Sequence, residues 1–162
     1  MKRLERSALI LSALLAFATP LTGCATHYIP NTDVEDNDDN RKLIAFCERY
    51  RHAVENKDIA TLLKLAGRNY FEDGGNIDPT DDIDYAGLKG YLTSKFQDAT
   101  AIRYEIRYRK VSKDRKLIFV EYTYSASYRI PGLKTEEWRH PVTDNRLELV
   151  PYQDEYRIVA GM

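Results

Sequence analysis

Three patterns of hydrophobic and polar residues follow one another along the chain. An apolar run over Ala8–Ala18 comes first, and a polar, acidic stretch leads from there to Asn40. Apolar residues then recur at helical spacing between Arg41 and Phe96, and beyond Phe96 they alternate with polar residues at the period of a β-strand. This order predicts helices followed by strands, preceded by an N-terminal region of a different kind.

The helical region predicts three helices. The first covers Arg41–Asn56, and Asp58 then caps a second, shorter helix over Ile59–Ala66. Asp84 caps a third helix over Tyr85–Phe96. At 100° per residue the first helix collects its apolar side chains in one arc, made of Leu43, Phe46, Cys47, Tyr50 and Val54. The first two helices are therefore expected to form a hairpin that buries one face.

The second half of the chain predicts an antiparallel sheet. Ile102, Tyr104, Ile106 and Tyr108 alternate with charged residues, as in a strand with one buried face. A turn at Ser112–Arg115 leads to a long strand from Ile118 to Tyr128, and three shorter strands are expected at 135–140, 146–150 and 155–160. Sequential strands with short turns pair antiparallel. The predicted class is α+β: a helical hairpin plus a third helix packed on a curved antiparallel sheet.

The N-terminus has the three zones of an export signal. A basic start is followed by the apolar run and by a short segment that contains Pro20. This segment ends Leu21-Thr22-Gly23-Cys24, which resembles the lipobox of bacterial lipoproteins. The resemblance implies that residues 1–23 are removed and that Cys24 carries the lipid that anchors the protein to a membrane. Ala25 resembles the residues that allow transport to the outer membrane, so we expect an exported protein facing the periplasm.

Residues 24–40 are interpreted as the lipidated cysteine and an acidic, flexible tether. Between Ala25 and Asn40 there are five acidic residues and no lysine or arginine. Such a segment has little to bury and is typically unfolded. The expected domains are thus 1–23, 24–40 and a folded domain over 41–162. Since lipidation uses Cys24, Cys47 has no partner in the chain and is expected to be a small buried residue.

Composition narrows the function classes. The 162 residues carry a formal net charge of −1, which argues against a nucleic-acid partner. The three histidines are far apart, without cysteine or carboxylate at ligand spacing, so we expect no structural zinc and no cofactor. The 12 tyrosines suit strands and pockets with one polar end. A homodimer formed through the sheet is a candidate assembly.

The stretch Phe46–Ala66, FCERYRHAVENKDIATLLKLA, resembles the opening hairpin of the nuclear transport factor 2-like superfamily. An aromatic helix, a polar break ending in Asp58 and a leucine-rich second helix carry this resemblance, and the helix and strands that follow continue the same order. The superfamily includes ketosteroid isomerases, dehydratases, polyketide cyclases and many binding domains. It implies a cone-shaped domain whose ligands occupy the space between helices and sheet.

Two functions follow from this resemblance. The first is a non-catalytic module that binds a small apolar ligand or a protein of the cell envelope, in a pocket lined by Tyr50, Tyr104, Tyr122, Tyr124 and Trp138. The second is a small isomerase or cyclase, because ketosteroid isomerases use a tyrosine of the first helix and an acid after the second helix. Tyr50 and Asp73 stand near those positions and are the candidates for proton transfer.

Overall fold

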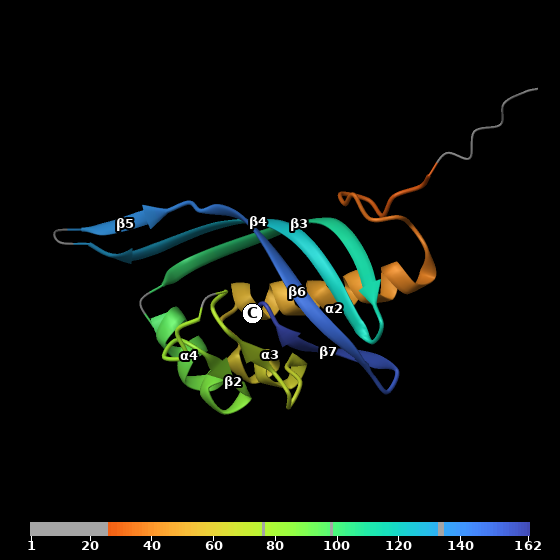
Figure 1. Ribbon diagram of the computed structural model, residues 1–162. Helices are drawn as coiled ribbons and strands as arrows, with labels where there is room; N and C mark the ends of the chain where they lie inside the picture. Colours follow the sequence, from red (N-terminus) through yellow and green to blue (C-terminus); the bar gives the residue numbers. More distant parts are fainter. Residues whose placement is uncertain (1–25, 76, 98, 133–134) are drawn as a thin grey trace, which may run out of the picture.

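The computed structural model describes residues 26–75, 77–97, 99–132 and 135–162. The predicted signal segment and Cys24 lie outside these residues. Figure 1 shows a layer of helices packed on one face of a long, curved sheet. None of the described helices is long and apolar enough to cross a membrane.

The helices are α2 (Asp38–Glu55), α3 (Ile59–Leu65) and α4 (Tyr85–Gln97). Helix α2 begins three residues earlier than predicted because the Asn37 side chain accepts a hydrogen bond from the backbone N–H of Asn40 and caps it. Two aspartates in its first turn further favour this start through the helix dipole. Asp58 caps α3 as expected, by accepting from the backbone N–H of Thr61.

The main sheet contains five antiparallel strands. Their bounds are β3 (Thr100–Asp114), β4 (Leu117–Pro131), β5 (Glu136–Arg139), β6 (Val142–Tyr152) and β7 (Glu155–Ala160). The order is β3-β4-β6-β7, and β5 pairs with the end of β4. A separate two-stranded sheet joins β1 (Phe71–Glu72) to β2 (Ile83–Asp84). The predicted α+β class is confirmed, although β3 and β6 are longer than expected.

The hydrophobic core lies between the helices and the concave face of the sheet. Alternate residues of β4 and β6 point into it, opposite the apolar faces of the helices. The side chains that are almost inaccessible to solvent include Phe46, Leu62, Leu88, Val120, Tyr122, Leu147 and Ile158. Cys47 is among them, as predicted, and burial raises the pKa of its thiol.

The segment that precedes α2 is folded against the domain. We call residues 27–36 the N-terminal strap. The backbone N–H of Asp36 donates to the carbonyl oxygen of His27 at 2.7 Å, and that of Asp33 donates to the carbonyl oxygen of Tyr108 on β3 at 2.9 Å. Val34 is only 2% exposed and belongs to the core. The prediction of a flexible tether is therefore wrong from His27 onward.

The acidic residues of this region find basic partners that are distant in sequence. Asp33 pairs with Arg107 at 2.5 Å and with Arg109 at 3.0 Å. These two guanidinium groups lower the pKa of the Asp33 carboxyl to about 2. Asp36 pairs with Arg41 of α2, and Asp39, in the first turn of α2, pairs with Lys113 of β3. Asp33 thus docks the strap onto two arginines of β3, whereas Glu35 stays exposed to solvent.

Candidate functional site

An apolar cavity of about 580 Å³ lies between the helices and the concave face of the sheet. Helices α2, α3 and α4 supply one wall, and the first residues of β3 with the second half of β4 supply the other. Its aromatic lining consists of Tyr50, Tyr91, Phe96, Tyr104, Tyr124 and Tyr128. Lys95 carries the only charged side chain in the described lining, and none of the described lining residues is an aspartate or a glutamate. The cavity therefore suits an apolar or aromatic molecule.

Three of the predicted pocket residues meet in this cavity. Tyr50 projects from the buried face of α2 and is 4% exposed. Tyr104 of β3 pairs in register with Ala126 of β4, which places the ring of Tyr104 beside that of Tyr124, with centroids 5.3 Å apart. The helical arc and the strand alternation thus converge on one wall of tyrosine rings.

The phenol groups at this wall are held in the neutral form. Burial is the main cause that raises the pKa of Tyr50, and the neighbouring phenols of Tyr122 and Tyr104 add to it. Burial also raises the pKa of Tyr104 to about 12. At neutral pH these hydroxyls can donate and accept hydrogen bonds but carry no charge. They can orient a polar group of a ligand without acting as a base.

Tyr122 occupies a special place between two cavities. Its side chain is 1% exposed and lines a second, polar cavity, while its phenol influences the pKa of Tyr50, which lines the apolar one. Its hydroxyl makes no hydrogen bond of acceptable geometry to any described residue. The hydroxyl is itself buried, close to the phenols of Tyr50 and Tyr104, so Tyr122 forms part of the packed wall of the apolar cavity.

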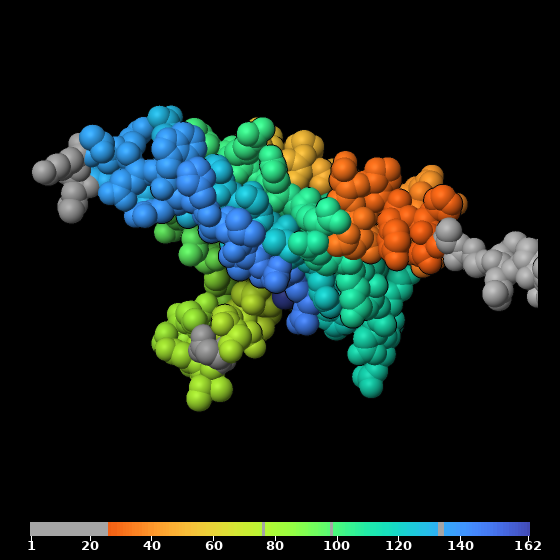
Figure 2. Space-filling model, turned by 90° about the horizontal axis from the view of Figure 1, so that it is seen from above, coloured from red at the N-terminus to blue at the C-terminus, as the bar shows by residue number. Residues whose placement is uncertain are grey.

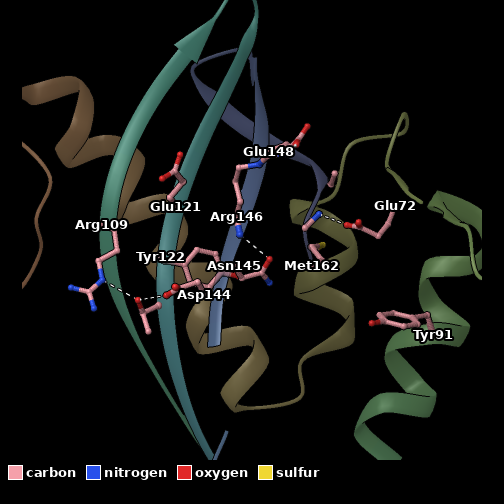
Figure 3. A pocket seen from close by; sticks show the side chains of 13 residues that line it. Glu72, Tyr91, Arg109, Glu121, Tyr122, Asp144, Asn145, Arg146, Glu148 and Met162 are labelled. Carbon is pink, nitrogen blue, oxygen red and sulfur yellow. Dashed lines mark hydrogen bonds and ion pairs between the residues drawn. The ribbon is translucent and has the colours of Figure 1, made fainter. Parts of the chain in front are cut away.

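The polar cavity of about 800 Å³ adjoins the apolar one, and the two share Tyr91, Asn145 and Met162 in their linings. Figure 3 shows Tyr91 reaching it from α4, opposite side chains of the sheet. Gly161, whose φ of 90° disfavours other residues, turns the chain at its rim. Its backbone N–H donates to the carboxylate of Glu72 at 2.6 Å.

The charged residues that the main sheet adds to this lining lie on its outer face, because Thr123 and its partner Asp144 alternate with the inward-facing Tyr122 and Asn145. Arg109 donates to the hydroxyl of Thr123 at 2.9 Å, and that hydroxyl donates to Asp144 at 2.6 Å, a chain visible in Figure 3. Arg146 forms an ion pair with Glu148 at 2.6 Å. The apolar cavity and these charged pairs therefore lie on opposite faces of the sheet.

Trp138 does not reach either cavity. It lies on β5, is 52% exposed, and stacks on the ring of His140 with centroids 5.8 Å apart. The guanidinium group of Arg129 lies 5.6 Å from the centre of its ring. Figure 1 shows β5 and the end of β4 extending beyond the helices, so no helix covers this aromatic side chain. The prediction of Trp138 as a pocket residue is wrong.

Asp73 is not brought to Tyr50. It follows β1 in an exposed loop, where its carboxylate accepts a hydrogen bond from the backbone N–H of Gly75 at 2.9 Å. The apolar cavity that Tyr50 lines does not include it. The proposed proton-transfer pair therefore lacks the common site that general acid–base chemistry requires.

Several lining residues were not among the sequence candidates. The alternation along β4 predicts Tyr128 on the same face as Tyr122 and Tyr124, although it was not a pocket candidate. Tyr91 follows Leu88 by three residues on α4 and shares its helical face. Met162 gave no such signal, because only the turn after β7 brings it between the cavities.

The sequence matches no protein-family model and no curated protein. Solved structures do match its fold. A Kribbella flavida protein has a TM-score of 0.63 at 15% identity, covering 76% of this chain and 87% of that one. A candidate scytalone dehydratase from Novosphingobium aromaticivorans has a TM-score of 0.61 at 9% identity, covering 76% and 80%.

A third similar structure carries the name of the superfamily itself. It is a candidate dehydratase of the nuclear transport factor 2 (NTF2)-like family from Streptomyces avermitilis, with a TM-score of 0.59 at 11% identity, covering 76% of this chain and 93% of that one. At such identities the likeness concerns the fold alone. The folded part of this chain therefore has the cone-shaped α+β fold of the NTF2-like proteins, with its largely apolar cavity between the helices and the sheet.

Proposed function

We propose that the protein is an exported lipoprotein, anchored through Cys24, whose domain binds a small ligand without catalysing a reaction. The observation that carries the binding role is the apolar cavity, which is lined by aromatic side chains and has no aspartate or glutamate among its described lining residues. Its volume of about 580 Å³ is typical of ligand sites. The lipobox-like sequence before Ala25 supports the anchor, and periplasm-facing outer membrane is the proposed location.

The adjoining polar cavity indicates the character of the ligand. An apolar body would occupy the space beside Tyr50 and Tyr104, and a polar end would reach Asn145, which lines both cavities. The amide side chain of Asn145 can donate and accept hydrogen bonds at this boundary.

Binding of N-phenyl-1-naphthylamine, a neutral aromatic probe that fluoresces in apolar surroundings, tests the proposal. Ala126 lines the cavity and is 6% exposed, so Ala126→Leu fills space that the probe would occupy. Ala60 is exposed on α3, outside the cavity lining, and Ala60→Leu is the matched control.

We expect the unaltered chain and Ala60→Leu to bind the probe equally. Ala126→Leu should bind it about tenfold more weakly, a difference of about 1.4 kcal/mol. Circular dichroism verifies that both variants remain folded. No fluorescence increase with the unaltered chain, or equal binding by the two variants, would contradict the proposed site.

A further inference from the structure

We propose that the N-terminal strap holds the domain against the membrane in one orientation. The strap faces the lipid surface, and the mouth of the apolar cavity faces the aqueous compartment at the opposite end of the domain. This inference rests on the proposed lipid anchor at Cys24. It adds to that proposal the surface that meets the membrane and the side from which ligands arrive.

The distance between anchor and domain is short. His27 is held at the start of α2, because its carbonyl oxygen accepts the backbone N–H of Asp36, at the other end of the strap, at 2.7 Å. Three residue steps separate it from Cys24, and a fully extended chain spans at most about 3.6 Å per residue, or about 11 Å in total. A free tether as long as the one predicted from the sequence would have reached about 50 Å. The domain consequently stays beside the lipid headgroups.

The strap is attached firmly enough to transmit an orientation. Ile29 packs against the core, and its backbone N–H donates to the carbonyl oxygen of Val34 at 2.9 Å. Asp33 adds a backbone hydrogen bond to β3 and its two ion pairs. Tyr28, next to the docked start, exposes 56% of its surface. A phenol ring with one polar end suits the interface between lipid and water.

The cavity opens far from this end. Helix α2 rises about 1.5 Å per residue, so Asn37 beside the strap and Val54 at the cavity are about 25 Å apart along its axis. The exposed lining residues Ser94 and Lys95 lie at the end of α4. Figures 1 and 2 show the strap at one end of the domain and the β4–β5 hairpin at the other.

This arrangement has a consequence for the ligand. A lipid of the anchoring membrane would have to leave the bilayer and travel the length of the domain to enter the cavity. A molecule in the aqueous compartment meets the mouth directly. The orientation therefore favours a ligand delivered through water over one extracted from the membrane that holds the protein.

The test uses the full chain, produced in a bacterium that processes lipoproteins and reconstituted into vesicles of phosphatidylethanolamine and phosphatidylglycerol. A fraction of the lipid carries a nitroxide on its headgroup, which quenches fluorophores only at short range. Two variants place one label each, Glu35→Cys in the strap and Ser94→Cys at the cavity mouth; both positions are exposed. Cys47 is fully buried and remains unlabelled.

We expect the label at position 35 to be quenched several-fold more than the label at position 94. Insertion of about twelve glycine and serine residues between Ala25 and Thr26 adds roughly 20 Å of flexible reach and should remove this difference. Equal quenching on protein that floats with the vesicles and carries lipid on Cys24 overturns the orientation alone. An unmodified Cys24 in the mass spectrum, with loss of flotation, overturns the anchor and the orientation together.

Discussion

Replacement of Val34 by alanine distinguishes a docked strap from a free tether. The Val34 side chain is 2% exposed and lies in the core, so the substitution removes two buried carbon atoms. At about 0.8 kcal/mol for each buried methylene-sized group, the transfer contribution is about 1.6 kcal/mol. A residual cavity raises the expected loss to about 2 kcal/mol. A flexible tether would show no loss.

The matched control is Val142→Ala, in which the same chemical change is made at a valine that is 67% exposed on β6. We expect this variant to lose about 0.5 kcal/mol or less, since exposed positions contribute little. Urea unfolding measures both, with stability taken from the midpoint at constant slope.

If the strap detaches on its own, urea unfolding of the whole domain reports only part of the stability that Val34→Ala removes. If the strap opens before the rest of the domain, the loss appears instead as faster hydrogen exchange at the amides of Ile29 and Asp33, which are hydrogen-bonded in the docked state. An unchanged urea midpoint together with unchanged exchange at these amides in Val34→Ala would refute the docked strap.

Four further predictions use the same structure. Cys24→Ser should abolish flotation with vesicles, because the acceptor thiol is lost; mass spectrometry of the N-terminal peptide checks this. Tyr50→Phe should lower the free energy of unfolding and the probe affinity by about 1 kcal/mol each, whereas Asp73→Asn should leave the probe affinity unchanged. A hundredfold loss of a measured turnover in both variants would instead support an isomerase. Tyr108→Phe should lose about 1 to 2 kcal/mol in urea unfolding, because its hydroxyl donates to Glu48 at 2.9 Å. Since the folded pKa of Asp33 is about 2, below its ordinary value of 3.8, its stabilisation of the strap is complete above pH 3.8 and is lost as the pH falls toward 2; an NMR titration midpoint near 4 would contradict this.

The sequence by itself determined the order of elements and the faces they bury. Helical spacing and strand alternation are local patterns, so Tyr50, Tyr104 and Tyr124 were expected to point inward, and they do. The start of the second helix at Asp58 was also predictable, because an N-cap residue bonds to a backbone N–H within three residues of its own position. Local chemistry was sufficient for these features.

Only the tertiary structure decided which of these side chains share a site. Trp138 occupies a strand as expected, yet β5 extends past the helices and no helix covers its ring. Asp73 follows the second helix, and this order of elements suggested that it would lie near Tyr50. Its carboxylate instead accepts a hydrogen bond within its own loop. The strap shows the same limit most clearly. Its acidic residues predicted a solvated segment, but the fold brings Arg107 and Arg109, more than seventy residues away in sequence, beside Asp33. Ion pairs of this kind depend on contacts between distant parts of the chain, which composition and local periodicity do not encode.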